Sequence, residues 1–265
     1  MSTLALGLDR TVLELKMYSR EKEAVFFSFL LPILLLALFS TIFGGQFEGG
    51  DGSMTAGRFF LPGMVAAGVL LTSFQTMAMS VATERDDGTL KRLRATPMPP
   101  LAYFLGKVGL VAVSSLAQVA LLLVVARVAY GVELPTDAAA WGRFASVFAL
   151  GVLSGTALGI AYSSLASARS VGAVVIGPIL VLQFISGVYI AFADIPDWLK
   201  QVASVFPLKW IAQGMRSAFY PDDMGSLEMA GSWETGRTLL VLAAWAVVGL
   251  VLCVTTFTWF KRGTT

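Results

Sequence analysis

The sequence predicts an all-α integral membrane protein with six transmembrane helices, folded as one domain over residues 1–265. The chain is 56% hydrophobic and only 14% charged, against about 25% charged residues in a typical soluble domain. Its charged residues avoid six windows, each long enough to cross a bilayer as a helix. The windows lack the strict apolar–polar alternation of a transmembrane barrel. The predicted spans are residues 24–47, 59–83, 108–126, 144–168, 170–193 and 238–260.

Residue types that are missing exclude several chemistries. The chain has no His, which excludes a His-based triad, a HExxH zinc site and a His proton relay. Its one cysteine, Cys253, has no partner for an intrachain disulfide. No phosphate-binding GxxxxGK[ST] loop is present, since the pair Gly106–Lys107 lacks the required glycine spacing. We therefore expect no catalytic residue, no metal site and no cofactor in this chain.

The N-terminal segment 3–22 has helical periodicity and precedes the first span. One face is mostly apolar (Leu4, Leu8, Val12, Leu15 and Ser19), and another carries Arg10, Glu14, Met17 and Glu21. Such a segment beside a span is typical of a helix in the membrane interface; a solvated leader is the alternative. After the first span, the glycine-rich stretch 44–58 is expected to be a flexible connector on the other side.

Placement of Lys and Arg predicts the orientation. With the N-terminus inside, 12 of the 19 basic residues fall in cytoplasmic segments, together with 7 of the 17 acidic ones. The positive-inside rule then places both termini in the cytoplasm.

Few polar side chains lie within the spans. The following residues are candidates for a substrate pathway: Thr72, Phe74, Gln75 and Met79 in the second span, and Gln183, Phe184 and Ser186 in the fifth. Helix–helix hydrogen bonds and core packing are the alternative role for them. In the fourth span, Gly151, Gly155 and Gly159 form two GxxxG steps on one face, which predicts close helix packing.

Residues 84–95 are predicted to form a short cytoplasmic helix after the second span. Asp86 and Asp87 suit a helix start, Lys91, Arg92 and Arg94 suit its end, and Pro97 stops it. Leu90 and Leu93 form a small apolar face that fits a groove on a soluble partner. An ordinary positively charged loop is the alternative.

External residues 194–219 are predicted to form two short helices, Pro196–Phe206 and Pro207–Phe219, with a proline at the start of each. They are too short to span and are expected to re-enter the outer leaflet or cap the bundle. A surface hairpin is the alternative. The residues singled out in this hairpin are Pro196, Trp198, Phe206, Pro207 and Arg216.

Two motifs resemble ABC-2-type transporter permeases, and among them the daunorubicin-resistance-type drug exporter permeases. The first is residues 84–97 (ERDDGTLKRLRATP), closing with Leu105–Lys107; its Asp86 stands where Glu is commoner in the family. The second is the series Ser186–Tyr189, Ile195–Leu199, Phe206–Leu208 and Gly214–Arg216. The resemblance covers the chain from the leader to the last span.

This resemblance implies six spans, an interface helix and re-entrant external helices. It also implies that two permease copies, identical or similar, pair with two copies of a separate ATPase that binds ATP and Mg. The loop helix would then be the coupling helix in an ATPase cleft. The implied contact residues are Glu84, Arg85, Asp86, Asp87, Gly88, Thr89, Leu90, Arg92, Leu93 and Arg94.

We therefore expect the permease subunit of an ATP-driven exporter in a bacterial cytoplasmic membrane, in contact with lipid and not with nucleic acid. The uncharged spans favour a hydrophobic or amphipathic substrate such as a drug, natural product or lipid. A polysaccharide or lipid-linked glycan remains an alternative substrate. A secondary transporter or channel is the second reading, although the spans contain no Asp, Glu or His to bind a coupling ion. A membrane enzyme is the third.

Overall fold

A computed structural model describes residues 2–47, 54–165 and 167–259 of the chain, and within these ranges every regular element is a helix. Residues 48–53 of the predicted connector, positions 166 and 260 of two predicted spans, and the bases Lys261 and Arg262 lie outside the described residues. The helices are α1 (Thr3–Tyr18), α2 (Lys22–Phe47), α3 (Ala56–Leu70), α4 (Thr76–Asp86), α5 (Thr89–Arg94), α6 (Pro100–Tyr130), α7 (Ala138–Tyr162), α8 (Val171–Ile185), α9 (Asp197–Val205), α10 (Pro207–Phe219) and α11 (Thr235–Thr256).

Among the described residues, five helical stretches are long and apolar enough to cross a membrane. They are Lys22–Phe47, Ala56–Asp86, Pro100–Tyr130, Ala138–Leu165 and Thr235–Thr256. The second of these joins α3 and α4 through a π-helical turn, Leu71–Gln75. This confirms a multi-pass protein that is helical over its described residues, and the fifth predicted span is the exception.

The fifth predicted span, 170–193, contains a helix shorter than predicted, so the six-span count is not confirmed. Helix α8 has only 15 residues, which at about 1.5 Å per residue gives roughly 22 Å, less than the roughly 30 Å hydrocarbon core. It ends at Ile185 because the backbone turns at Gly187, whose φ of +74° favours glycine. Apolar composition continues past this turn, so the charge-free window is longer than the helix.

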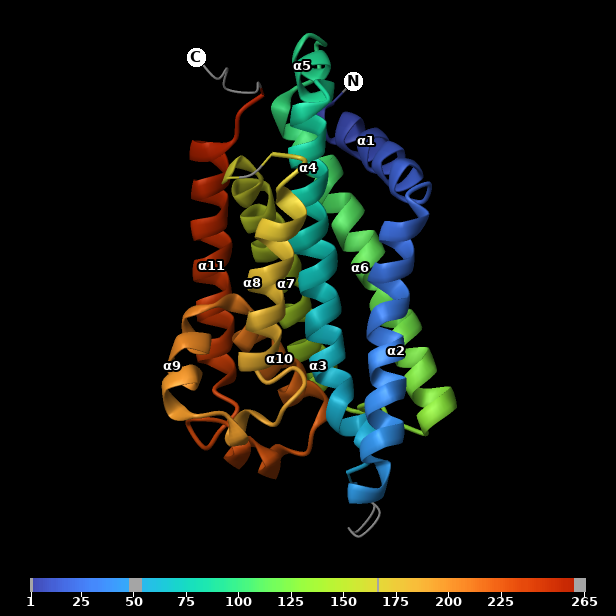
Figure 1. Ribbon diagram of the computed structural model, residues 1–265, viewed down its shortest axis with the longest axis vertical. Coiled ribbons are helices and arrows are strands. Elements are labelled where there is room, and N and C mark those ends of the chain that lie inside the picture. Colours follow the sequence, from blue (N-terminus) through green and yellow to red (C-terminus); the bar gives the residue numbers. More distant parts are fainter. Residues whose placement is uncertain (1, 48–53, 166, 260–265) are drawn as a thin grey trace.

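The helices run roughly along the long axis of the molecule, with different short elements at its two ends (Figure 1). Helices α1 and α5 lie at one end, where α11 also finishes. Helices α9 and α10 lie toward the other end (Figure 1). The start of the chain and the predicted coupling segment therefore share one end of the bundle.

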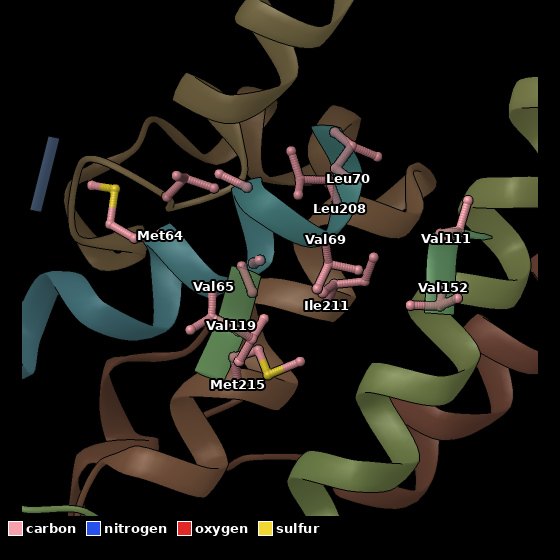
Figure 2. Close-up of a cluster of buried hydrophobic side chains, with 14 of the residues drawn as sticks. Met64, Val65, Val69, Leu70, Val111, Val119, Val152, Leu208, Ile211 and Met215 are labelled. Atoms are coloured by element: carbon pink, nitrogen blue, oxygen red, sulfur yellow. The ribbon is translucent and has the colours of Figure 1, made fainter. Parts of the chain in front are cut away.

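Helix α10 lies inside the bundle. All 13 of its residues are buried, and it packs against α3, α7 and α11. Figure 2 shows Leu208, Ile211 and Met215 of α10 beside Val65 and Val69 of α3. These aliphatic contacts form the core into which α10 inserts.

The peripheral helices are apolar on the outside. In α2, the buried stripe is Ser28, Pro32, Leu36 and Ser40, whereas Phe26, Phe27, Leu34, Leu38 and Ile42 are exposed. Helix α8 likewise buries one stripe and exposes apolar side chains elsewhere. This inverted pattern is expected for helices whose outer faces meet lipid or another apolar helix.

The glycines of α7 lie against the π-helical turn. A Cβ added at Gly155 would lie 2.0 Å from Ser73 Oγ, and one at Gly159 would lie 2.5 Å from the backbone oxygen of Phe74. At Gly151 the nearest atom would be Ile211 Cδ1, at 3.2 Å. Because Gly155 and Gly159 have no side chain, α7 can pack closely against the π-helical turn of the second span.

Candidate functional site

The predicted coupling segment forms a sharp projection between two long helices. Helix α4 ends at Asp86, and Gly88 (φ +78°) reverses the chain direction in the left-handed region. Asp87 Oδ1 then accepts a hydrogen bond from the backbone N–H of Thr89 at 2.8 Å, which fixes the start of α5. Pro99 and Pro100 begin α6 on the return.

Two residues expected on the docking face are buried within the chain. Leu90 is 0% exposed and belongs to the main hydrophobic core, and Glu84 is 6% exposed. Both side chains are covered by other parts of the chain, and their contact with a partner stays a prediction. Leu90 and the half-buried Leu93 pack against the chain's own hydrophobic core. Their spacing predicts an apolar face but does not indicate which surface covers it.

Of the other predicted contact residues, two bind elsewhere in the chain and the rest are exposed or half-buried. Arg85 Nη2 donates to the backbone oxygen of Ser163 at 2.5 Å, and Asp86 Oδ2 accepts from the N–H of Ala168 at 2.8 Å. Both tie the end of α4 to the segment between α7 and α8. Residues Asp87, Arg92 and Arg94 are exposed, together with Lys91, and Gly88, Thr89 and Leu93 are half-buried.

Substituting Leu90 by aspartate is expected to destabilise the permease by about 2–4 kcal/mol, because it removes a fully buried aliphatic side chain and buries a carboxylate. The thermal midpoint of the detergent-solubilised protein should fall, whereas Lys91→Asp, at an exposed neighbour, should leave it within a degree or two. A folded Leu90→Asp protein with the wild-type midpoint would contradict the burial of this side chain.

A network of buried charged and polar side chains lies behind the coupling segment. We call it the ion cluster, and its members are Arg10, Glu14, Ser80, Glu84, Tyr103 and Lys107. It joins α1, α4 and α6. Its two formal positive charges balance two negative charges, so the site is neutral as a whole.

Lys107 is the centre of the ion cluster and is 0% exposed. Its Nζ donates to Glu14 Oε2 at 2.9 Å, to Ser80 Oγ at 2.9 Å, and to Glu84 Oε1. Tyr103 OH donates to the other Glu84 oxygen at 2.9 Å. Three protein acceptors thus meet the three ammonium protons, which is what a buried lysine requires.

Helix α1 places its charged face on the protein. Arg10 and Glu14 are buried and paired at 2.5 Å, while Leu4 and Leu8 are 68% and 69% exposed. The Arg10 side chain fits because Gly106 has none: a Cβ there would lie 2.3 Å from Arg10 Cγ. The outward apolar face suits the membrane interface, and the inward charges hold α1 on α6.

Sequence reasoning did not identify the ion cluster as a unit. The predicted third span, 108–126, leaves Lys107 outside the membrane helix. In the structure, α6 begins at Pro100 and Lys107 lies two turns into it. One signal in the sequence points to part of the ion cluster. Arg10 and Glu14 are four residues apart, which predicts that they pair on one face of the helix. The position of Lys107 relative to this pair depends on the tertiary fold.

The predicted pathway residues differ in how accessible they are. Thr72 is buried and donates to the backbone oxygen of Gly68, and Gln183 is buried and accepts from Tyr189 OH at 2.5 Å. Ser186 is also buried. The more accessible members are Phe74, Gln75 and Met79, which are half-buried, and Phe184, which is 48% exposed.

At the opposite end, Arg216 of α10 forms a buried ion pair. Its Nε donates to Glu228 Oε1 at 2.6 Å and its Nη1 to the backbone oxygen of Gly187 at 2.8 Å. The pair therefore connects α10 to the turn after α8 and to the segment before α11. Burial lowers the pKa of neighbouring Lys209 to about 8, although the Glu228 carboxylate partly opposes this shift.

The two predicted external helices are present as α9 and α10. Pro196 immediately precedes α9, and Pro207 is the first residue of α10, as expected. Phe206 is half-buried between them, while Trp198 is 66% exposed on an apolar face of α9 that also presents Val202 and Val205.

Comparison with known proteins shows similarity to a transporter family and to a curated protein. Residues 10–220 match the model of the ABC-2 type transporter family. A daunorubicin resistance ABC transporter permease protein of Streptomyces coeruleorubidus is 25% identical over 231 residues, which cover 83% of this chain and 74% of the relative. The matched region includes the coupling segment and both external helices.

Proposed function

Because the chain belongs to the ABC-2 type transporter family, and is therefore a membrane transport subunit, we propose that it is the permease of an ATP-driven exporter in a bacterial cytoplasmic membrane. A separate ATPase subunit, present in two copies with its ATP and Mg, supplies the energy. A second permease copy, identical or similar, completes the transport unit. The exported substrate is hydrophobic or amphipathic, in keeping with the drug-resistance relative.

The single observation that supports this proposal most strongly is the exposed face of the coupling segment. Lys91, Arg92 and Arg94 are exposed on α5, at the end of the bundle that also holds α1 (Figure 1). The Arg94 guanidinium lies 5.8 Å from the ring centroid of Trp259, which steadies the end of α5. A basic projection of this kind fits a cleft lined with carboxylates on the ATPase.

The substrate pathway is proposed to follow the half-buried face of the second span and the exposed face of α8. Phe74, Gln75 and Met79 lie on the first, and Phe184 lies on the second. Their aromatic and thioether groups can adapt to varied apolar shapes. A second permease copy facing these surfaces would enclose the pathway, which one chain leaves open.

Both termini are proposed to lie in the cytoplasm. This orientation places the basic coupling segment with the ATPase and places α9 on the outer side. The apolar face of α9, with Trp198, Val202 and Val205 exposed, would then contact the outer leaflet.

Copurification tests the partner. Membranes of the native host should yield an ATPase subunit bound to the tagged wild-type chain. The charge reversal Lys91→Glu with Arg92→Glu should reduce its recovery at least about tenfold, the equivalent of roughly 1.4 kcal/mol, because like charges then meet in the cleft.

Lys16→Glu with Arg20→Glu provides the matched control. It changes the net charge by the same amount at exposed positions of the α1 region, and recovery should be unchanged. The proposal fails if the wild-type chain retains no ATPase, or if the isolated chain hydrolyses ATP by itself.

A further inference from the structure

We propose that the ion cluster is the mechanical joint between the coupling segment and the membrane bundle, with Lys107 as its positioning residue. This inference rests on the proposed function, since it requires an ATPase that moves α5. Its content is separate: the buried ions make the end of α4, the interface helix α1 and the start of α6 move as one body.

The geometry at the end of α4 supports the joint. Three consecutive charged residues bind two other parts of the chain. Glu84 reaches Lys107 of α6, Arg85 reaches Ser163 and Asp86 reaches the backbone of Ala168. Helix α5 follows directly after these ties, so a displacement of α5 acts on an anchored helix end rather than on a free loop.

The ammonium group of Lys107 binds a carboxylate on α1 and another on α4. Glu14 binds Lys107 with one carboxylate oxygen and Arg10 with the other, while Lys107 also binds Glu84. A second contact runs through Tyr103, whose ring lies 5.6 Å from the Arg10 guanidinium and whose hydroxyl donates to Glu84. Lys107 is thus the group that joins α1 to α4 by direct ion pairs. A charge that is fully buried and paired on both sides resists separation, because pulling either carboxylate away leaves an uncompensated ion.

The composition of the ion cluster argues against a role in packing alone. Buried ion pairs contribute little net stability compared with apolar residues of the same volume. An apolar contact, however, allows helices to slide, whereas ion pairs with fixed donors and acceptors specify one arrangement. The ion cluster therefore holds the three helices in one fixed arrangement.

Charge-balanced variants separate transmission from stability. Lys107→Met with Glu84→Gln removes one positive and one negative charge and leaves the pair Arg10–Glu14 intact. Arg10→Met with Glu14→Gln removes the opposite pair and leaves Lys107 with Glu84. Both variants keep the surface of α5 unchanged, so each is expected to retain the copurified ATPase.

Distance measurement by double electron–electron resonance provides the readout. Spin labels are placed at Leu8→Cys on α1 and Val247→Cys on α11, both at exposed positions, in a background of Cys253→Ala. In Figure 1, α1 and α11 lie at opposite sides of the bundle. The complex with its copurified ATPase is compared without nucleotide and after trapping with ATP and vanadate.

We expect a nucleotide-dependent distance change in the wild-type cluster and its loss in both charge-balanced variants, while ATPase recovery stays the same. The same distance change in a variant as in the wild type would overturn the joint, as would an absent change in the wild type. Misfolding of both variants would also overturn it, because the ion cluster would then be a purely structural element. Failure of the wild-type chain to retain an ATPase would instead refute the proposed function.

Discussion

Replacing Lys107 alone by methionine is expected to lower the free energy of unfolding by about 3–5 kcal/mol, the cost of breaking a buried ion pair by removing one partner. Two carboxylates, Glu14 and Glu84, would be left with only Arg10 to balance them. Because Lys107 is 0% exposed, water cannot replace the lost ammonium group. Unfolding in mixed micelles, titrated with a denaturing detergent, measures the change.

Two comparisons make this prediction specific. Lys91→Met, at an exposed position of α5, should change the free energy of unfolding by less than about 0.5 kcal/mol. Adding Glu84→Gln to Lys107→Met should recover a large part of the loss, because the charge balance returns. If Lys107→Met were as stable as the wild type, the Lys107 side chain would not be buried among paired carboxylates.

Replacing Arg216 by methionine is expected to have a similarly large effect at the opposite end, again about 3–5 kcal/mol. The substitution leaves Glu228 buried without its cation and removes the hydrogen bond to the backbone oxygen of Gly187. Since both partners lie outside α10, the connection of α10 to the turn after α8 should loosen as well. Trypsin cleavage after Lys200, in the external segment, should become faster along with the fall in stability.

Arg237→Met is the matched control for Arg216. Arg237 also pairs with a glutamate, at 2.9 Å from Glu234, but its side chain is 63% exposed. Exposed pairs contribute only about 0–1 kcal/mol, so this variant should remain near wild-type stability. Equal effects of the two substitutions would show that burial does not decide the role of Arg216.

The long helices were predictable because length and composition alone determine them. Charge-free windows correspond to α2, α7 and α11 with small shifts at their ends. The third span was predicted too short because its window starts after the charge of Lys107, whereas three acceptors within the protein hold this side chain in α6. A charged side chain indicates the end of a membrane helix when water solvates it, but not when other side chains pair with it inside the protein.

The fifth span was predicted too long for a related reason. Residues after Ser186 remain apolar, but Gly187 turns the chain and presents its carbonyl oxygen to Arg216, 29 positions later. Likewise, the spacing of Leu90 and Leu93 indicated an apolar face without indicating that the permease covers it. Local patterns define which faces are apolar, and only the tertiary fold determines their neighbours.

The complete burial of α10 has a consequence for biogenesis. A 13-residue helix is too short to be inserted as a span during translation, and its site is bounded by α3, α7 and α11. Helix α11 is synthesised after α10, so the site is complete only once the last span is in the membrane. The core around α10 can therefore close only after α11 has been synthesised.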